Sequence, residues 1–360
     1  MYKIDKKWWM GCLVTTLILI TGCHSIGPNM VSADRFDYNT AIANSWKEQT
    51  LLNIVKLRYS DMPLFVEVAS VVSGYTLERS VNVNGTLSSA TAMQGDFLGM
   101  GASGRFTDRP TITYSPLTGK KFNQNFLTPL PPKSLLFLIQ SGWPADMILQ
   151  LTVDSVNGLR SRSLAGTNVH SGDADFYEFL RLFRELQKTG NIGMRILTNK
   201  SEKQTTVIFF HKKEMTPDQK AHLLKMYKLL KIKPNSEEIV VNYGSIAQND
   251  SELMLLSRSM LQIMIKLASM IDVPQEHVDK GYTVPTVING TKNVKRMMTV
   301  KCGDKKPEHA LTSIYYHDTW FWIEDSDFYS KRTFSFLMIL FSLTETGGDK
   351  GLPLITIPAG

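Results

Sequence analysis

The chain has 360 residues, of which 43% are hydrophobic and 20% are charged, a composition typical of a folded globular protein with one large domain or two. The formal net charge of +7 is a mild excess, and no basic stripe interleaved with aromatic residues is present, which argues against nucleic acid as a partner. With only three cysteines, a disulfide framework is excluded and stability must come from a buried core.

The first 22 residues have the layout of a secretory signal peptide. Positive charge comes first, with Lys3, Lys6 and Lys7 against one acidic residue. The apolar segment 11–20 follows, and it is shorter than the roughly 20 apolar residues that a helix needs to cross a bilayer. A charged start, a short apolar centre and small residues before a cut predict that residues 1–22 are removed. The remaining chain then carries a net charge of about +5.

A lipidation signal ends this segment. Ile20-Thr21-Gly22-Cys23 resembles the lipobox of bacterial lipoproteins, with Ile where Leu is more usual. The resemblance implies cleavage between Gly22 and Cys23 and lipid on the new N-terminal cysteine, and two or three acyl chains anchor a protein stably. His24 after the cysteine, rather than Asp, implies the outer membrane facing the periplasm, with the inner membrane as the alternative. An uncleaved signal anchor is the competing interpretation.

The mature chain is predicted to begin with a lipidated tether over residues 23–36. A helix is predicted over 37–59, because apolar residues recur there near helical spacing. Pro63 marks the break after this helix. The segment 64–78 is rich in β-branched residues on both faces, which predicts a buried strand.

From Arg79 the pattern changes to strict alternation of apolar or glycine residues with small polar ones. Two arms of about ten residues surround a stretch rich in small residues, which predicts a long β-hairpin over about 79–107. Alternation places one set of residues on the same side, and these are the candidate membrane-facing residues: Val81, Val83, Leu87, Leu98, Met100, Ala102 and Phe106.

Two interpretations of the hairpin stay open. One is a soluble hairpin that lies on its own domain. The other is a membrane-inserting hairpin, because arms of about 9–11 alternating residues are what a transmembrane β-strand requires. Several protomers would then each contribute one hairpin, so that no strand edge is left open in lipid. This arrangement resembles the architecture of lipidated secretion channels of the curli type. The facing of Arg105 is open at this stage, and no aromatic girdle marks the tip.

The middle of the chain predicts two helices over 130–140 and 144–159, separated by a Ser-Gly-Trp-Pro break. The segment 161–173 is polar and rich in small residues. It is the predicted linker between an N-terminal domain, residues 37–160, and a C-terminal domain, residues 174–360.

The C-terminal region interleaves helices and strands. Helices are predicted over 175–188, 217–232, 251–271 and 332–345, and strands over 192–198, 204–210, 237–243, 294–302, 310–318 and 319–325. The last two strands form a tight hairpin. Because the elements follow no regular βαβ period, the predicted fold class is α+β.

Motifs that could carry chemistry have plainer explanations. The G-x-G-x-x-G over 99–104 is followed by an extended segment with Pro110, not by the helix that binds a dinucleotide. The acidic residues Glu324, Asp325 and Asp327 could serve acid–base chemistry or bind a cation, but they join a strand to a helix, where Asp and Ser cap exposed N–H groups.

Other side chains are assigned to structure on the same grounds. The histidines have no ligand spacing and no G-x-S-x-G elbow is present, so no metal, cofactor or catalytic residue is predicted. Cys302 is expected to be an inert thiol. Trp320 and Trp322 could stack on a sugar or peptide, while alternation sends Phe321 to the opposite, core face. The apolar helix 333–343 is expected in the core, with a subunit contact as the alternative.

Several stretches resemble a family of bacterial lipoproteins of uncharacterised activity, found in proteobacteria. They are LLNIVKLRYSDMP, RPTITYSPLTG, QSGWP, RSMLQIM and WFWIEDSDFYSKRTFSFLMILFSLTETG. The resemblance covers most of the mature chain and implies no activity and no functional residue beyond the lipobox.

Three functions are therefore weighed. The leading hypothesis is a lipid-anchored, non-catalytic scaffold or assembly component of the cell envelope, with envelope proteins or further copies of itself as partners. The second is a subunit of an oligomeric outer-membrane pore or secretion channel to which each copy contributes its hairpin. An envelope hydrolase is the third.

Overall fold

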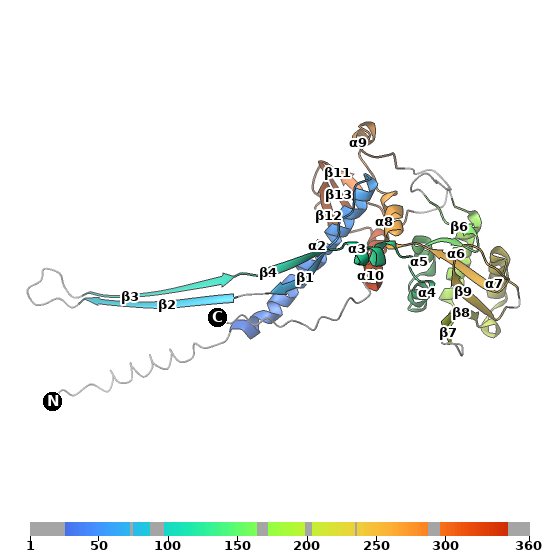
Figure 1. Ribbon diagram of the computed structural model, residues 1–360, viewed down its shortest axis with the longest axis horizontal. Coiled ribbons are helices and arrows are strands. Elements are labelled where there is room, and N and C mark those ends of the chain that lie inside the picture. Colours follow the sequence, from blue (N-terminus) through green and yellow to red (C-terminus); the bar gives the residue numbers. More distant parts are fainter. Residues whose placement is uncertain are drawn as a thin grey trace, which may run out of the picture. The chain divides into compact units, whose positions relative to one another are not determined.

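The computed structural model describes residues 26–72, 75–86, 97–163, 172–198, 204–234, 236–286 and 296–344 (Figure 1). The described chain divides into two compact units. The first holds residues 26–45 and 67–115, and the second holds residues 46–66 and 116–344. None of the described helices is both long and apolar enough to cross a membrane.

The first unit contains the N-terminal part of helix α2 (Ile26–Arg58) and two ribbons of paired strands. Strands β1 (Val66–Val72) and β4 (Thr111–Pro116) form one two-stranded sheet, and β2 (Tyr75–Thr86) and β3 (Phe97–Asp108) form the other (Figure 1). The predicted long hairpin is therefore present.

Two secondary-structure expectations for this part of the chain are wrong. The helix predicted over 37–59 begins earlier, at Ile26, so the described residues 26–36 of the predicted tether are helical. The predicted buried strand 64–78 is two elements, β1 and the start of β2, and no residue of β1 is buried. β1 pairs only with β4, so its β-branched residues are half-buried or exposed.

The second unit is built around a six-stranded sheet in the order β6-β5-β10-β9-β8-β7. Its strands are β5 (Val153–Val156), β6 (Leu159–Arg160), β7 (Ile192–Thr198), β8 (Gln204–Phe210), β9 (Glu238–Tyr243) and β10 (Glu252–Ser257). Only β9 and β10 pair in parallel. A three-stranded antiparallel sheet follows, in the order β11 (Lys301–Gly303), β13 (Thr319–Glu324), β12 (Ala310–Tyr316). The fold class is α+β, as predicted.

Helices complete the second unit. They are the C-terminal part of α2, α3 (Gly119–Phe122), α4 (Pro132–Gln140), α5 (Ala145–Thr152), α6 (Ala174–Lys188), α7 (Pro217–Leu230), α8 (Met260–Ala268), α9 (Gln275–Asp279) and α10 (Phe328–Thr344), with short η1 (Asn123–Leu127) and η2 (Lys212–Glu214). Helix α7 begins at a capping box, in which Thr216 Oγ1 accepts from the amide of Gln219 and the Gln219 side chain accepts from the amide of Thr216.

The predicted domain boundary does not coincide with the observed division. Strand β5 lies before the predicted linker and pairs with β10, nearly a hundred residues later. One sheet therefore contains strands from both sides of the segment 161–173. The two ends of that segment also meet each other. The amide of Asp173 donates to the carbonyl of Arg160 at 2.9 Å, and a carboxylate oxygen of Asp173 accepts from the amide of Arg160 at 2.7 Å. The residues on both sides of the segment therefore belong to the same unit.

Two predicted helices were too long. The helix over 144–159 ends at Thr152, where Val153 turns to extended backbone and starts β5. The helix over 251–271 is strand β10 followed by α8, because burial alternates along β10 and Ser259 then starts a new helix. Ser259 Oγ accepts from the amide of Gln262, and the Gln262 side chain accepts from the amide of Ser259. Within the described part of the predicted strand 294–302, which starts at Arg296, β11 takes up only the last two residues.

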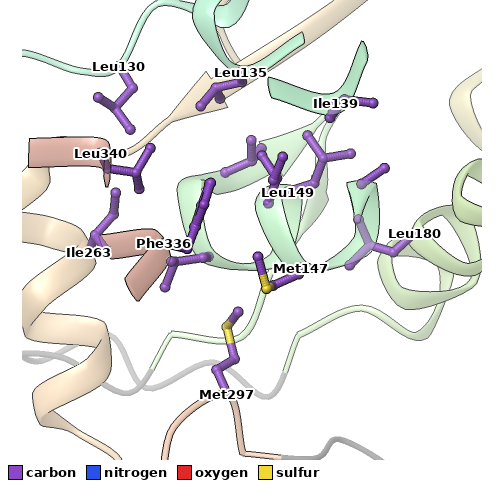
Figure 2. Packing of buried hydrophobic residues seen from close by; sticks show 14 of the residues in the cluster. Leu130, Leu135, Ile139, Met147, Leu149, Leu180, Ile263, Met297, Phe336 and Leu340 are labelled. Atoms are coloured by element: carbon purple, nitrogen blue, oxygen red, sulfur yellow. The ribbon is translucent and has the colours of Figure 1, made fainter. Parts of the chain in front are cut away.

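The core of the second unit is apolar and continuous across these elements. Figure 2 shows side chains from α4, α5, α6, α8 and α10 packed together, among them Leu135, Met147, Leu180, Ile263 and Phe336. Helix α10 contributes Phe334, Phe336, Leu337, Leu340 and Phe341, each at most 5% exposed. The expectation that this helix belongs to the core is confirmed.

Candidate functional site

The β2–β3 hairpin has an unbroken register. Twelve residues of β2 pair with twelve of β3, from Tyr75 opposite Asp108 to Thr86 opposite Phe97. At about 3.4 Å per residue, each strand is roughly 40 Å long. Within the described part of the chain no third strand pairs with β2 or β3. Both outer edges therefore carry backbone N–H and C=O groups without a strand partner there.

The register brings the candidate membrane-facing positions together. Val81 lies opposite Ala102 and Val83 opposite Met100, while Leu98 and Phe106 occupy equivalent alternate positions of β3. Directly opposite residues of an antiparallel pair share a face, so these six positions lie on one face of the ribbon. Leu87, Gly22 and Cys23 lie outside the described residues. Contact of this face with a membrane stays a prediction.

The other face of the ribbon is polar and exposed. Ser80 lies opposite Ser103, with their hydroxyl oxygens 2.5 Å apart, and Asn82 lies opposite Gly101. Arg105 lies opposite Glu78, and both side chains are exposed. The facing of Arg105, open in the sequence, is thereby assigned to the polar face.

Arg79 pairs with Gly104 and lies on the face that carries the apolar positions. It therefore places a cationic residue on that face, between the positions of Phe106 and Val81. On β4 of the same unit, Ile112 is 40% and Tyr114 is 62% exposed, so large apolar side chains also face solvent there. The sequence analysis did not single out these two residues.

The acidic residues near 325 act as structural groups. Asp327 precedes α10, and its carboxylate accepts from the amide and the hydroxyl of Ser330 at 3.1 and 2.6 Å. Hydrogen bonds from Lys301 to Glu324 and from Lys331 to Asp325 lower the pKa of both carboxyl groups. The three carboxylates have separate partners, which supports the capping interpretation over a shared acid–base site.

Other sequence motifs also take structural positions. The G-x-G-x-x-G lies within strand β3, and strand β4 follows it, so the helix that a dinucleotide needs is not at this position. Phe321 is fully buried, whereas Trp320 and Trp322 are half-buried on the other face of β13. Burial raises the pKa of the Cys302 thiol to about 11, as expected for an inert cysteine.

A cluster of aromatic and imidazole rings forms a site that the sequence analysis missed. The ring of His317 stacks on Tyr59 and Tyr282, with centroids 5.1 and 5.6 Å apart, and lies edge-on to Tyr316 at 4.4 Å. The rings come from the end of α2, from the residues after α9 and from the turn between β12 and β13. These segments lie far apart in sequence, so no local pattern could have joined them.

Backbone strain coincides with this cluster. His317 and Asp318 form the two-residue turn between β12 and β13, and both have positive φ, 48° and 57°. Ser60, directly after Tyr59, has φ 58°. Turns of this type favour Asn and Gly, so a His-Asp turn is held by its surroundings, here by the rings that pack on His317.

Hydrogen bonds and burial set the environment of the ionisable side chains in the cluster. Tyr59 Oη lies 2.7 Å from Nδ1 of His277. Burial raises the pKa of Tyr59, while burial and the neighbouring His317 lower the pKa of His277. The neutral forms of both rings are therefore favoured, and they share this hydrogen bond. Burial, followed by the hydrogen bond that Tyr316 donates to Asp61 at 2.8 Å, raises the pKa of Tyr316 to about 12.

Among the described residues, no group of three or more His, Cys, Asp or Glu side chains is arranged to hold a metal ion. Comparisons of the chain with protein-family models, with curated proteins and with solved structures found no match.

Proposed function

We propose that this chain is a lipid-anchored scaffold or assembly component of the bacterial cell envelope, and that the β2–β3 hairpin is the element through which copies join. The lipobox at Ile20–Cys23 supports the anchor, by its resemblance to that of bacterial lipoproteins. The following residue, His24, supports the periplasmic side of the outer membrane as the destination. The resemblance of the mature chain to bacterial lipoproteins is consistent with both the lipid anchor and this destination.

The observation that carries the proposal is the state of the hairpin edges. An isolated two-stranded ribbon is marginally stable in water, and a long strand with an open edge is a template for a further strand. Here twelve consecutive pairs leave both edges without a strand partner in the described chain. Pairing of β2 of one copy with β3 of the next would satisfy both edges with a single repeated contact.

The hairpin also favours a second candidate, a pore built from several copies. Strands of twelve residues exceed the about 9–11 that a tilted transmembrane strand needs. The apolar positions around Val83 and the polar positions around Ser80 lie on opposite faces, the pattern of a strand with lipid on one side and water on the other. A closed ring of such hairpins would leave no open edge in lipid.

The oligomeric state of the mature, lipidated protein in mild detergent tests both candidates. Light scattering coupled to size-exclusion chromatography would compare the unaltered chain with Val83→Asp and with Asn82→Asp. The two variants place the same charge on adjacent residues of β2 that lie on opposite faces. We expect oligomers for the unaltered protein. A monomer across the working concentration range would overturn the assembly proposal.

Leakage of a trapped dye from vesicles of phosphatidylethanolamine and phosphatidylglycerol separates the two candidates. A pore predicts leakage with the unaltered chain and with Asn82→Asp, and loss of leakage with Val83→Asp, because a carboxylate on the lipid face is costly to bury. Oligomers without leakage would overturn the pore and support the scaffold. Mass spectrometry of the same samples, with Cys23→Ser as control, checks the lipid anchor.

A further inference from the structure

A buried lysine and a buried serine contact each other beside the six-stranded sheet. Lys266 lies on α8, and Ser161 directly follows β6. Nζ of Lys266 lies 2.9 Å from Oγ of Ser161 and donates to the carbonyl oxygen of Gln150 at 2.7 Å. The two residues are 7% and 2% exposed. Neither takes part in the hairpin or the aromatic cluster.

The surroundings of Lys266 disfavour its charge. Its two hydrogen-bond partners are uncharged oxygens. Burial, and after it the charge of Arg258, lower its pKa well below the usual range of lysine. The carboxylate of Asp154 opposes this shift but accepts a hydrogen bond from Arg258 Nη2 at 2.8 Å.

Arg258 is held as the permanent cation of this region. Its guanidinium is nearly buried and donates to the carbonyl oxygens of Leu151 and Val153 at 3.1 and 2.5 Å as well as to Asp154. Arginine stays protonated in proteins, so the lysine next to it is the group that loses its proton. A neutral amine has a lone pair that can accept the hydroxyl proton of Ser161.

We infer that Ser161 and Lys266 form a nucleophile and general-base pair for acyl transfer, with a small carboxylic ester or amide as substrate. The Ser161 oxygen forms a bond to the acyl carbon, and Lys266 takes the hydroxyl proton. As the bond from the acyl carbon to the leaving group breaks, Lys266 returns that proton to the leaving group. Water then attacks the acyl-serine with the same base, which releases the acid and restores the hydroxyl.

The amide that follows the nucleophile is also suited to this reaction. The N–H of the residue after a catalytic serine often stabilises the acyl oxyanion. Here the amide of Arg162 donates to the phenol oxygen of Tyr177 at 3.2 Å, a long bond that a charged oxygen could replace. Gly172 packs against the same pair. A Cβ added there would lie 2.8 Å from the Arg162 nitrogen and 2.9 Å from the Tyr177 oxygen, so a side chain at this position would crowd the site.

The burial of the pair restricts the substrate. With both side chains less than a tenth exposed, an ester can reach the serine only after the surrounding residues move, and a small acyl group requires the least movement. The same burial disfavours the ammonium form of Lys266 and so favours a neutral amine as base. A purely structural lysine in this place would hold the Gln150 carbonyl and the Ser161 hydroxyl together without making that hydroxyl nucleophilic.

Acetylation by p-nitrophenyl acetate distinguishes the two roles. The full-length mature protein would be incubated with the ester and mapped by peptide mass spectrometry. Ser155 on β5 is the matched control, because it is also buried, at 3% exposed, and its hydroxyl has no hydrogen-bond partner among the described residues. We expect acetyl-Ser161 and no acetyl-Ser155. The absence of acetyl-Ser161 in the unaltered protein would overturn the inference, whatever the variants do.

Two variants then test the base. Lys266→Met keeps the length of the side chain but removes the amine, and it should slow acetylation of Ser161 roughly a hundredfold or more. Ser161→Ala should abolish the label at this position and leave the circular dichroism spectrum unchanged. In the unaltered protein the rate should rise with pH and level off below the ordinary lysine pKa of about 10.4. Lys266 would be rejected as the base if folded Lys266→Met acetylated Ser161 as fast as the unaltered protein. A rate of acetylation with the same pH profile in both proteins would reject it as well.

Discussion

The hydroxyl of Tyr59 and Nδ1 of His277 share a hydrogen bond of 2.7 Å, which joins the residue after α2 to α9. The neighbouring Arg58 strengthens the same junction, because its guanidinium donates to the carbonyl oxygen of Val284 at 2.7 Å and to the hydroxyl of Thr286 at 3.0 Å. The end of the N-terminal helix is therefore held by a segment more than 200 residues later. Burial in this junction disfavours the charged form of His277.

Stability should fall as the pH drops through the range in which His277 would gain a proton. Burial and the charge of His317 lower the pKa of His277 in the folded chain, whereas an unfolded histidine titrates near about pH 6.5. The unfolded chain then binds more protons below that pH, so the free energy of unfolding decreases as the pH falls. Nearby Glu276 and Asp318 oppose this shift, and Lys280 adds to it.

Thermal unfolding between about pH 7 and about pH 5 measures the effect. His277→Gln should flatten the dependence on pH, while His309→Gln, which changes an exposed histidine, should leave it as it is. A slope that His277→Gln does not reduce would show that another group is responsible. Asp61, whose pKa the Tyr316 hydroxyl lowers, contributes in the separate range near the carboxyl pKa, where protonation removes its stabilising effect.

Asn157 should be among the most sensitive polar positions in the second unit. Its amide nitrogen donates to the carbonyl oxygens of Leu230 and Glu252 at 2.9 and 3.0 Å, and its carbonyl oxygen accepts from the amide of Met254 at 2.7 Å. Its φ is 46°, which Asn and Gly tolerate better than other residues. Asn157→Ala should lower the free energy of unfolding by about 2–4 kcal/mol.

Chemical denaturation of Asn157→Ala and Asn157→Gly separates the two causes. Glycine relieves the backbone strain but restores none of the hydrogen bonds, so it should recover only the smaller part of the loss, about 1 kcal/mol. Full recovery by glycine would mean that the three hydrogen bonds contribute little.

How far the sequence predicts this structure depends on whether the pattern is local. The hairpin from β2 to β3 and helices α6, α7 and α10 follow from alternation or helical spacing within one segment. The segment 251–271 does not, because a run rich in Leu, Met and Ile fits both periods, and the change at Ser259 depends on a cap that the apolar pattern obscures. Pairing of β5 with β10, and the contact of Ser161 with Lys266, join residues about a hundred positions apart. Periodicity contains no information on such partners.

Gly193 on β7 should not tolerate a side chain. A Cβ at this position would overlap the ring of Phe209, its partner on β8. Because the half-buried ring would have to turn away from its contacts with His211 and Arg195, Gly193→Ala should destabilise the protein by about 1–3 kcal/mol. The double variant Gly193→Ala with Phe209→Leu should be more stable than the single change predicts, as a double-mutant cycle by urea denaturation can show. Additive losses would contradict the packing explanation.

Cys302 should react slowly until the protein unfolds. Burial, followed by the charges of Asp272 and Asp304, raises the pKa of its thiol to about 11, so at about pH 8 the thiolate is roughly a hundredfold rarer than in an exposed cysteine. A chromogenic disulfide reagent should therefore label the native protein far more slowly than the protein in guanidinium chloride. The unfolded mature chain also reports on the anchor. If Cys23 carries lipid on its sulfur, the unfolded protein releases one equivalent of the chromophore, from the thiol of Cys302. Two equivalents would show that Cys23 is a free thiol and would contradict the lipobox interpretation.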